Sequence, residues 1–189
     1  MSVRYLTTEE IAAGLNVIAQ SPKSEGTLRL IVRRPRIGER EILDEAELDT
    51  TVGLVGDTWP QRKSSRTADG SPHPDMQLNV MNARTIALLA QTEARWPLAG
   101  DQLFMVLDLS EQNLPAGTQL ALGTAIIEVT SQPHTGCGKF VERFGADAMQ
   151  FVNSPTGRSL RMRGLNARVV RAGRIRAGDV VRKIIHEES

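Results

Sequence analysis

Cys137, the single cysteine of this sequence, is the residue best suited to nucleophilic or metal-binding chemistry. It stands between two glycines in the segment 132–140, after His134 and before Lys139. Glycine on each side lets the backbone turn sharply and lets a ligand approach the sulfur. Nearby His134, Lys139 and Arg143 favour the thiolate, the form that attacks electrophiles or binds metals. The segment predicts a thiol site in which Cys137 reacts or binds a metal and His134 donates a proton.

Each of these residues also has an interpretation that involves no chemistry. A lone cysteine is often a small buried hydrophobic side chain. A histidine in a surface loop needs no catalytic role. Lys139 and Arg143 also fit the solvated face of a short helix. The sequence leaves these alternatives open.

Positive charge gathers in the last third of the chain, although the net charge of the whole is only +1. From Pro133 to the C-terminus there are eleven basic and five acidic residues. Arg161, Arg163 and Arg168 form the best candidate anion-binding cluster, because guanidinium groups match the geometry of phosphate. Alternation would place Arg161 and Arg163 on one face of a strand, although the same pattern fits a charged outer surface. The asymmetry indicates an anionic partner.

Short alternating segments must position these residues, and they predict a mainly β fold. Strands are expected at residues 27–33, 76–81, 103–107, 118–122 and 124–130, with short extended runs at 164–181. Helices are expected at residues 7–21, after a cap at Asn82, and at 141–152. Many short strands with glycine at their corners predict a closed or partly closed β-barrel with helical decorations.

The length of 189 residues predicts one domain with a short extension, here a helical extension at 1–26 and a barrel at 27–189. The loop-rich stretch at 61–74 is long for a connection and indicates a functional or mobile loop. No apolar run approaches the roughly 20 residues that span a bilayer, so no membrane segment is expected. A polar N-terminus and a lone cysteine predict a cytoplasmic location.

Four segments, taken in order, make the chain resemble the MOSC domain, named after the C-terminal domain of the molybdenum cofactor sulfurase. They are the Gly-Leu-Val-Gly-Asp turn at 53–57, the run at 101–123, the Cys-Gly-Lys-Phe motif at 137–140 and the stretch at 163–181. Their shared order, with the cysteine directly after a strand, carries the likeness. The resemblance implies a β-barrel related to a small barrel of pyruvate kinase.

The resemblance also implies a cofactor. MOSC domains bind the molybdenum cofactor or transfer sulfur to it, and in reductase-type relatives the matching cysteine is the protein ligand to molybdenum. By that likeness Cys137 holds the metal or carries a persulfide. The phosphate of the cofactor then meets basic side chains, for which the candidates are Lys139, Arg143, Arg161, Arg163 and Arg168.

The implied protein is a molybdenum-cofactor-dependent oxidoreductase that reduces small N-hydroxylated compounds, or a sulfur carrier. A reductase needs a separate electron donor, because the sequence shows no evident flavin or iron–sulfur motif. Two positions depart from the family pattern. Residues 58–59 are Thr-Trp, where many members have a histidine after the Gly-Asp turn. Residues 100–102 are Gly-Asp-Gln, where relatives often have Arg-Arg-Asn.

The alternative function is a non-catalytic basic β-barrel that binds nucleic acid or an acidic protein partner. The excess of positive charge after Pro133 favours this alternative. Aromatic residues make up only 4% of the chain, which argues against nucleic acid, because single-strand platforms stack bases on aromatic rings.

Overall fold

Strand β1 (Glu25–Arg33) organises the sheet of this protein, whose computed structural model describes residues 4–185. The other barrel strands are β5 (Leu78–Asn82), β6 (Leu103–Val106), β7 (Gln119–Leu122), β8 (Ala125–Val129), β9 (Leu165–Arg171) and β11 (Val180–Lys183). β1 pairs with both β6 and β11. This double pairing closes a seven-stranded barrel in the order β1, β11, β7, β8, β9, β5, β6. Neighbouring barrel strands are antiparallel except β5 and β6, which are parallel.

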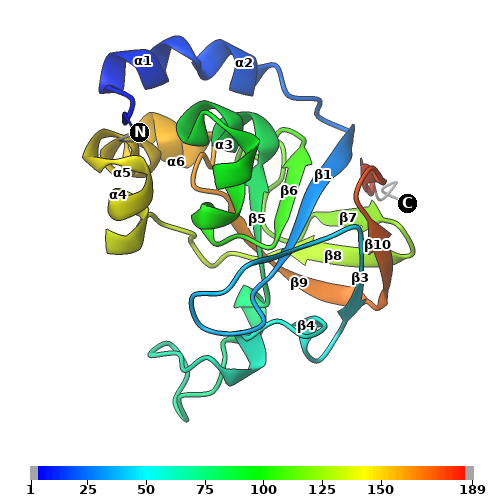
Figure 1. The fold of residues 1–189 in the computed structure, drawn as a ribbon. Coiled ribbons are helices and arrows are strands. Elements are labelled where there is room, and N and C mark those ends of the chain that lie inside the picture. The colour runs from blue at the N-terminus through cyan, green and yellow to red at the C-terminus, as the bar shows by residue number, and fades with distance from the viewer. Residues whose placement is uncertain (1–3, 186–189) are drawn as a thin grey trace.

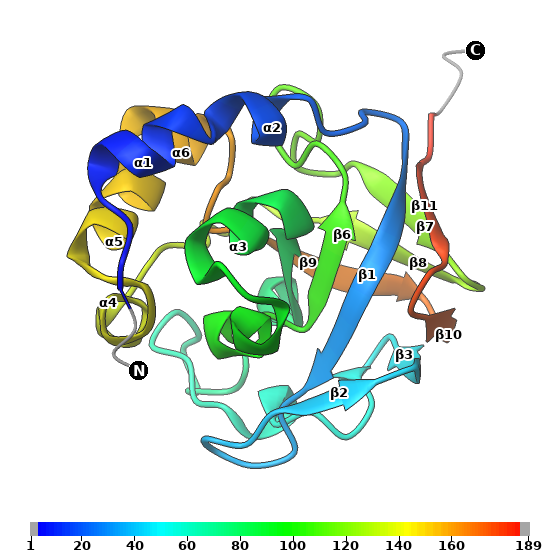
Figure 2. The same cartoon turned by 45° about the horizontal axis from the view of Figure 1, so that its top comes forward.

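The remaining strands extend the barrel at one side. β2 (Glu41–Leu43) pairs with the end of β1. A separate three-stranded sheet is formed by β3 (Glu45–Asp49), β4 (Gly53–Leu54) and β10 (Gly173–Arg176). Figure 2 shows β2, β3 and β10 on the side of the barrel opposite the helices.

Short helices cover the other side of the barrel (Figures 1 and 2). They are α1 (Thr8–Ala13), α2 (Leu15–Ala19), α3 (Ala83–Ala90), α4 (Gly138–Phe144), α5 (Ala146–Asn153) and α6 (Pro155–Ser159), together with the 3₁₀ helix η3 (Glu93–Ala99), whose Trp96 and Ala99 pack in the same apolar cluster. Two further 3₁₀ helices, η1 (Trp59–Gln61) and η2 (Pro74–Met76), lie in the segment between β4 and β5. α3 lies in the crossover between the parallel strands β5 and β6. Asn82 caps α3 by accepting a hydrogen bond from the Arg84 N–H, as predicted.

Apolar side chains form two cores, one inside the barrel and one between its outer face and the helices. On β1, Leu28 and Ile31 belong to the inner core, whereas Leu30 and Val32 belong to the outer one. A bulge between Leu28 and Leu30 shifts the alternation and turns Leu28 and Ile31 to the same side. Because both faces of such a strand are covered, it carries apolar residues on both.

The predicted fold class, a mainly β barrel with helical decorations, is confirmed. Two helices differ from prediction. The first is divided into α1 and α2 at Gly14, and the helix expected at 141–152 is divided into α4 and α5 at Gly145. Gly145 has a φ of 95°, a conformation that glycine adopts without steric cost and that interrupts a helix.

The N-terminal helices pack onto the rest of the molecule. Ile11 of α1 and Ile18 of α2 are buried in the outer core. The division into an extension at 1–26 and a barrel at 27–189 stays a prediction. Within residues 4–185, no helix combines the length and the apolar character needed to cross a bilayer.

Gly26 lies on β1 where the barrel closes, and a Cβ there would lie 1.9 Å from the backbone oxygen of Val106. We expect Gly26→Ala to push the strands apart and lower the free energy of unfolding by about 1–3 kcal/mol. Urea unfolding measures this loss. The matched control is Gly138→Ala, because no atom lies within 4 Å of its Cβ position. Equal stability of G26A and the parent would contradict the close approach of the strands.

Candidate functional site: a basic pocket beside Cys137

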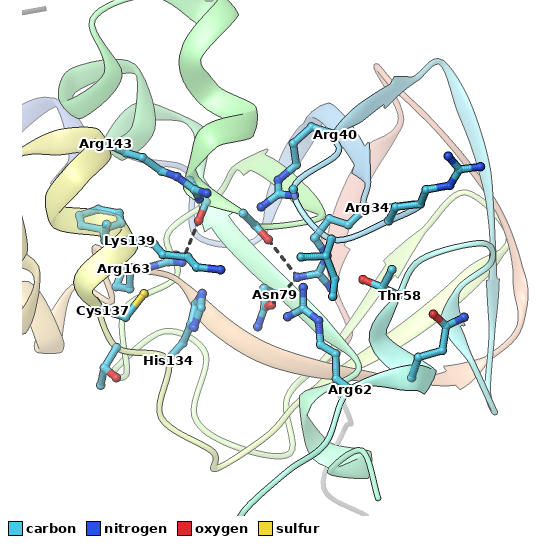
Figure 3. Close-up of a pocket in the computed structure, with 18 of the residues that line it drawn as sticks. Arg34, Arg40, Thr58, Arg62, Asn79, His134, Cys137, Lys139, Arg143 and Arg163 are labelled. Atoms are coloured by element: carbon cyan, nitrogen blue, oxygen red, sulfur yellow. Dashed lines mark hydrogen bonds between the residues drawn. The ribbon is translucent and has the colours of Figure 1, made fainter.

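A cavity of about 590 Å³ opens beside Cys137 (Figure 3). Its walls come from the loop after β1, the segment around η1, the turn before β6 and the chain leading into α4. Among residues 4–185, eight of those that line it are lysine or arginine, and none is acidic. The cavity therefore presents a positive surface next to the single thiol of the chain.

The segment that carries Cys137 is held against α5. The Gly136 N–H donates to the side-chain oxygen of Asn153 at 3.2 Å. A Cβ on Gly136 would lie 2.5 Å from the sulfur of Met149, so a side chain there would displace Met149. Cys137 itself is exposed and directly precedes α4. The thiol is thus open to a ligand, and its interpretation as a buried hydrophobic side chain is wrong.

Asp101 joins His134 and Arg163 from beneath the pocket. Its buried carboxylate accepts hydrogen bonds from Nη1 of Arg163 at 2.7 Å and from Nε2 of His134 at 2.9 Å. Arg163 also donates to the Ala99 carbonyl at 3.0 Å and lies over the ring of Phe140. Because a carboxylate only accepts hydrogen bonds, we assign the proton of His134 to Nε2, which leaves a lone pair on Nδ1.

The surroundings of His134 favour its neutral form. Burial lowers the pKa of His134 and the charge of Arg163 lowers it further, while Asp101 opposes both. Burial alone would raise the pKa of Asp101, but the charge of Arg163 and the hydrogen bonds from His134 and Arg163 outweigh it, so that this pKa is lowered. At neutral pH the three groups are a carboxylate, a guanidinium and a neutral imidazole that can accept a proton at Nδ1.

A second buried ion pair, between Arg34 and Asp57, lies under the opposite wall. Only 2% of the Arg34 side chain is exposed, and none of the Asp57 side chain. Nε and Nη2 of Arg34 donate to the two carboxylate oxygens at 2.8 and 2.7 Å, and Nη1 donates to the Gly100 carbonyl at 3.0 Å. Asp57 also accepts a hydrogen bond from the N–H of Trp59. The pair therefore joins the end of β1, the Gly-Asp turn and the turn before β6.

Residues from the first third of the chain supply the rest of the positive charge: Arg36, Arg40, Arg62 and Lys63. Burial and the charges of Arg143 and Arg34 lower the pKa of Arg40. Partial burial of the guanidinium and the charge of Arg34 lower the pKa of Arg62 to about 10, so that it stays protonated at neutral pH. These shifts show that the cations crowd one another around the pocket.

The structure brings five of the predicted site residues together at this pocket: Cys137, His134, Lys139, Arg143 and Arg163. Arg161 and Arg168 lie elsewhere. Residues 161–163 form a turn rather than a strand, in which Arg161 has a φ of 46° and donates to two backbone carbonyls. Arg168 lies on β9 and pairs with Asp75 and Glu128. The expected cluster of three arginines therefore does not form.

The sequence interpretation missed the arginines that the first third of the chain contributes. Arg34 and Arg36 flank a proline just after a predicted strand, and Arg62 and Lys63 open the loop at 61–74. The unusual length of that loop was the one signal that marked the region as functional. Nothing in the spacing of these residues links them to a cysteine far along the chain.

The positions that depart from the family pattern have structural roles. Asp101 anchors His134 and Arg163, as described above. Gln102 is buried, accepts a hydrogen bond from the Asn79 N–H and donates to the Gln77 carbonyl. Trp59 is buried, and Thr58 lines the pocket. The positive charge of the pocket comes from other positions.

Several arginines of the last third are paired at the surface. Besides Arg168, ion pairs hold Arg174 and Arg176 to Glu45 and Arg182 to Glu25. These carboxylates come from the first third of the chain. The charge excess that the sequence shows after Pro133 is therefore reduced at these positions once the chain is folded.

A family model described as MOSC domain matches residues 73–182, more than half of the chain. YuaD from Bacillus subtilis is similar in fold, with 16% identity, a TM-score of 0.59, and 83% of this chain and 94% of that chain covered. YiiM from Escherichia coli has 22% identity and a TM-score of 0.53, with 86% of this chain and 72% of that chain covered. YiiM from Geobacillus stearothermophilus has 16% identity and a TM-score of 0.52, with 86% of this chain and 74% of that chain covered. At these identities the likeness concerns the fold alone. A search of curated proteins gives no match.

Asp57→Asn leaves the Arg34 guanidinium buried without its charge partner. We expect the free energy of unfolding to fall by about 3–5 kcal/mol, because an uncompensated buried charge is strongly destabilising. The matched control is Glu41→Gln, which breaks an exposed pair with Arg33 and should cost less than about 1 kcal/mol. Chemical unfolding compares the two variants. Losses of similar size would contradict the structural role assigned to the buried pair.

His134→Gln tests the neutral imidazole through the pH dependence of stability. Because the pKa of His134 is lowered in the folded chain, the unfolded chain binds more protons as the pH falls below about 6.5. Stability of the parent should therefore decrease towards acid pH, with His134 contributing at most about 1.4 kcal/mol per pH unit. The slope should be shallower in the variant. Urea unfolding at a series of pH values measures it, and identical slopes would rule out this titration.

Proposed function

The chain belongs to the MOSC domain family, and we propose that its basic pocket binds the molybdenum cofactor with Cys137 as the protein ligand to molybdenum. One observation carries the proposal: an exposed thiol lies on the wall of a cavity that, within the described part of the chain, is lined by eight cationic residues and no carboxylate. The cavity volume of about 590 Å³ lies within the usual range for cofactor sites. Thiolates suit soft metal centres, and guanidinium groups suit phosphate.

The residues around the thiol fit an anionic cofactor. Lys139 and Arg143 lie on α4 directly after Cys137 and would contact the phosphate. Arg163 is already held by Asp101 and Ala99, so that it can meet an anion with little further loss of side-chain freedom. The unprotonated Nδ1 of His134 would accept or return a proton during the reaction.

When bound, the cofactor would supply redox chemistry for the reduction of a small N-hydroxylated substrate, which defines an oxidoreductase. If the Cys137 thiolate instead takes the outer sulfur of a persulfide donor, which leaves as a thiol, the same pocket would serve a sulfur carrier. The electrons for a reduction would come from a separate reductase, because an iron–sulfur cluster needs several cysteine ligands and this chain has one.

Cys137→Ser should abolish stable molybdenum binding, because serine replaces the soft thiolate ligand. Elemental analysis of protein purified from a host that makes the cofactor measures molybdenum per chain in the parent and the variant. Arg168→Gln is the matched control and should retain the parent content, because Arg168 lies outside the pocket. Equal molybdenum in parent and C137S, or none in either, would refute the ligand assignment.

The same purified parent and Cys137→Ser proteins distinguish a reductase from a sulfur carrier. A reductase should turn over N-hydroxylated compounds with a chemical reductant in place of its electron donor, and C137S should be inactive. A sulfur carrier should instead show an added sulfur atom on Cys137 in the intact mass of the parent. The persulfide should disappear on treatment with a thiol reductant.

A further inference from the structure

Five cations of the pocket have no carboxylate partner among residues 4–185: Arg40, Arg62, Lys63, Lys139 and Arg143. They differ from Arg34 and Arg163, whose charges are balanced from below by Asp57 and Asp101. Elsewhere on the described surface, arginines such as Arg168 and Arg182 do pair with carboxylates. Other cations, such as Arg29, Arg158 and Arg171, also lack a carboxylate partner among these residues, but the pocket brings five such cations together around one cavity.

These five cations lie on two walls. Lys139 and Arg143 belong to α4 beside Cys137, and we call them the near subsite. Arg40, Arg62 and Lys63 come from the loop after β1 and from the chain after η1, and we call them the far subsite. In Figure 3, Cys137 and Lys139 stand on one side of the pocket and Arg62 on the other, with Arg40 and Arg143 along the upper edge.

The two subsites meet at Gly100. A Cβ on Gly100 would have Nη2 of Arg40 at 3.6 Å and Nη1 of Arg143 at 3.9 Å as its nearest neighbours. Two guanidinium groups therefore converge on one point of the backbone, and neither is paired with a carboxylate among residues 4–185. Burial and, after it, the charges of Arg143 and Arg34 lower the pKa of Arg40. A bound anion would relieve the repulsion between these charges, which favours binding.

We propose that the pocket binds two anionic groups at once, one in the near subsite and one in the far subsite. The proposal rests on the function proposed above in one respect: the cofactor phosphate is assigned to the near subsite. A phosphate monoester carries a charge of about −1.5 to −2, so it balances about two of the five free cations and leaves about three. One phosphate is therefore too little charge for this cavity.

The second anionic group has two possible sources with the same chemistry. It is a second phosphate of the cofactor, joined to the first as a diphosphate, or it is a carboxylate or phosphate on the substrate. In both cases planar guanidinium groups of the far subsite meet oxyanions in their preferred geometry. Substrates that carry a negative charge would then be favoured over neutral ones.

Calorimetric titration with inorganic orthophosphate and pyrophosphate tests the proposal on the purified chain and needs no molybdenum. Arg62→Gln and Lys63→Gln, in the far subsite, should each weaken pyrophosphate binding by about tenfold and leave orthophosphate binding nearly unchanged. Lys139→Gln, in the near subsite, should weaken both. Arg168→Gln is the matched control and should change neither. Unfolding midpoints of all variants check that they are folded.

Equal effects of the far-subsite variants on the two probes would overturn the proposal, because they would indicate one diffuse basic surface. Unchanged binding of pyrophosphate in these variants would overturn it too.

The source of the second anionic group follows from the cofactor released on denaturation of the loaded protein. A ratio of two phosphates per pterin would assign both anionic groups to the cofactor. A ratio of one phosphate per pterin would assign the second anionic group to the substrate. If the parent contains no molybdenum, the proposed cofactor is refuted, but the phosphate and pyrophosphate titrations still test the two anion subsites.

Discussion

The buried ion pair between Arg34 and Asp57 is the interaction on which the pocket depends. It holds the end of β1 to the Gly-Asp turn and reaches the backbone of Gly100, so that three distant segments meet at one point. Asp101 does the same for the other wall, where it fixes His134 and Arg163. Neither carboxylate lines the cavity. These two carboxylates thus lie behind the cavity wall, and the cations line the cavity.

Gathering these charged side chains at one pocket lowers the stability of the folded chain. Buried ion pairs contribute little net stability because desolvation offsets their attraction, but they fix geometry. Burial first, and then the charges of neighbouring arginines, lower the pKa values of Arg40 and Arg62, which lie above these pairs. Natural proteins depart from the locally most stable arrangement mainly at functional sites. The exposed Cys137 beside these cations is consistent with a site for an anionic cofactor with a soft metal.

The barrel and part of the site could be predicted from the sequence. Alternating strands, the Asn82 cap and the cysteine segment depend on neighbouring residues, which a sequence displays directly. The division of two helices at Gly14 and Gly145 was not predicted, because apolar spacing continues across both glycines. The place of Arg40 and Arg62 in the site could not be predicted, because only closure of the barrel brings them to the same cavity as Cys137, which lies much later in the chain. That Arg168 lies outside this pocket could not be predicted either, because Asp75 and Glu128, with which it pairs, also lie far away in sequence.

X-ray absorption at the molybdenum edge tests the central claim most directly. The measurement compares the protein purified from a cofactor-producing host with the free cofactor in solution. The protein-bound molybdenum should show one more sulfur ligand than the free cofactor, because the Cys137 thiolate completes the coordination. An identical sulfur shell in the bound and the free cofactor would contradict the account, since the metal would then be bound without the thiol beside which the pocket opens.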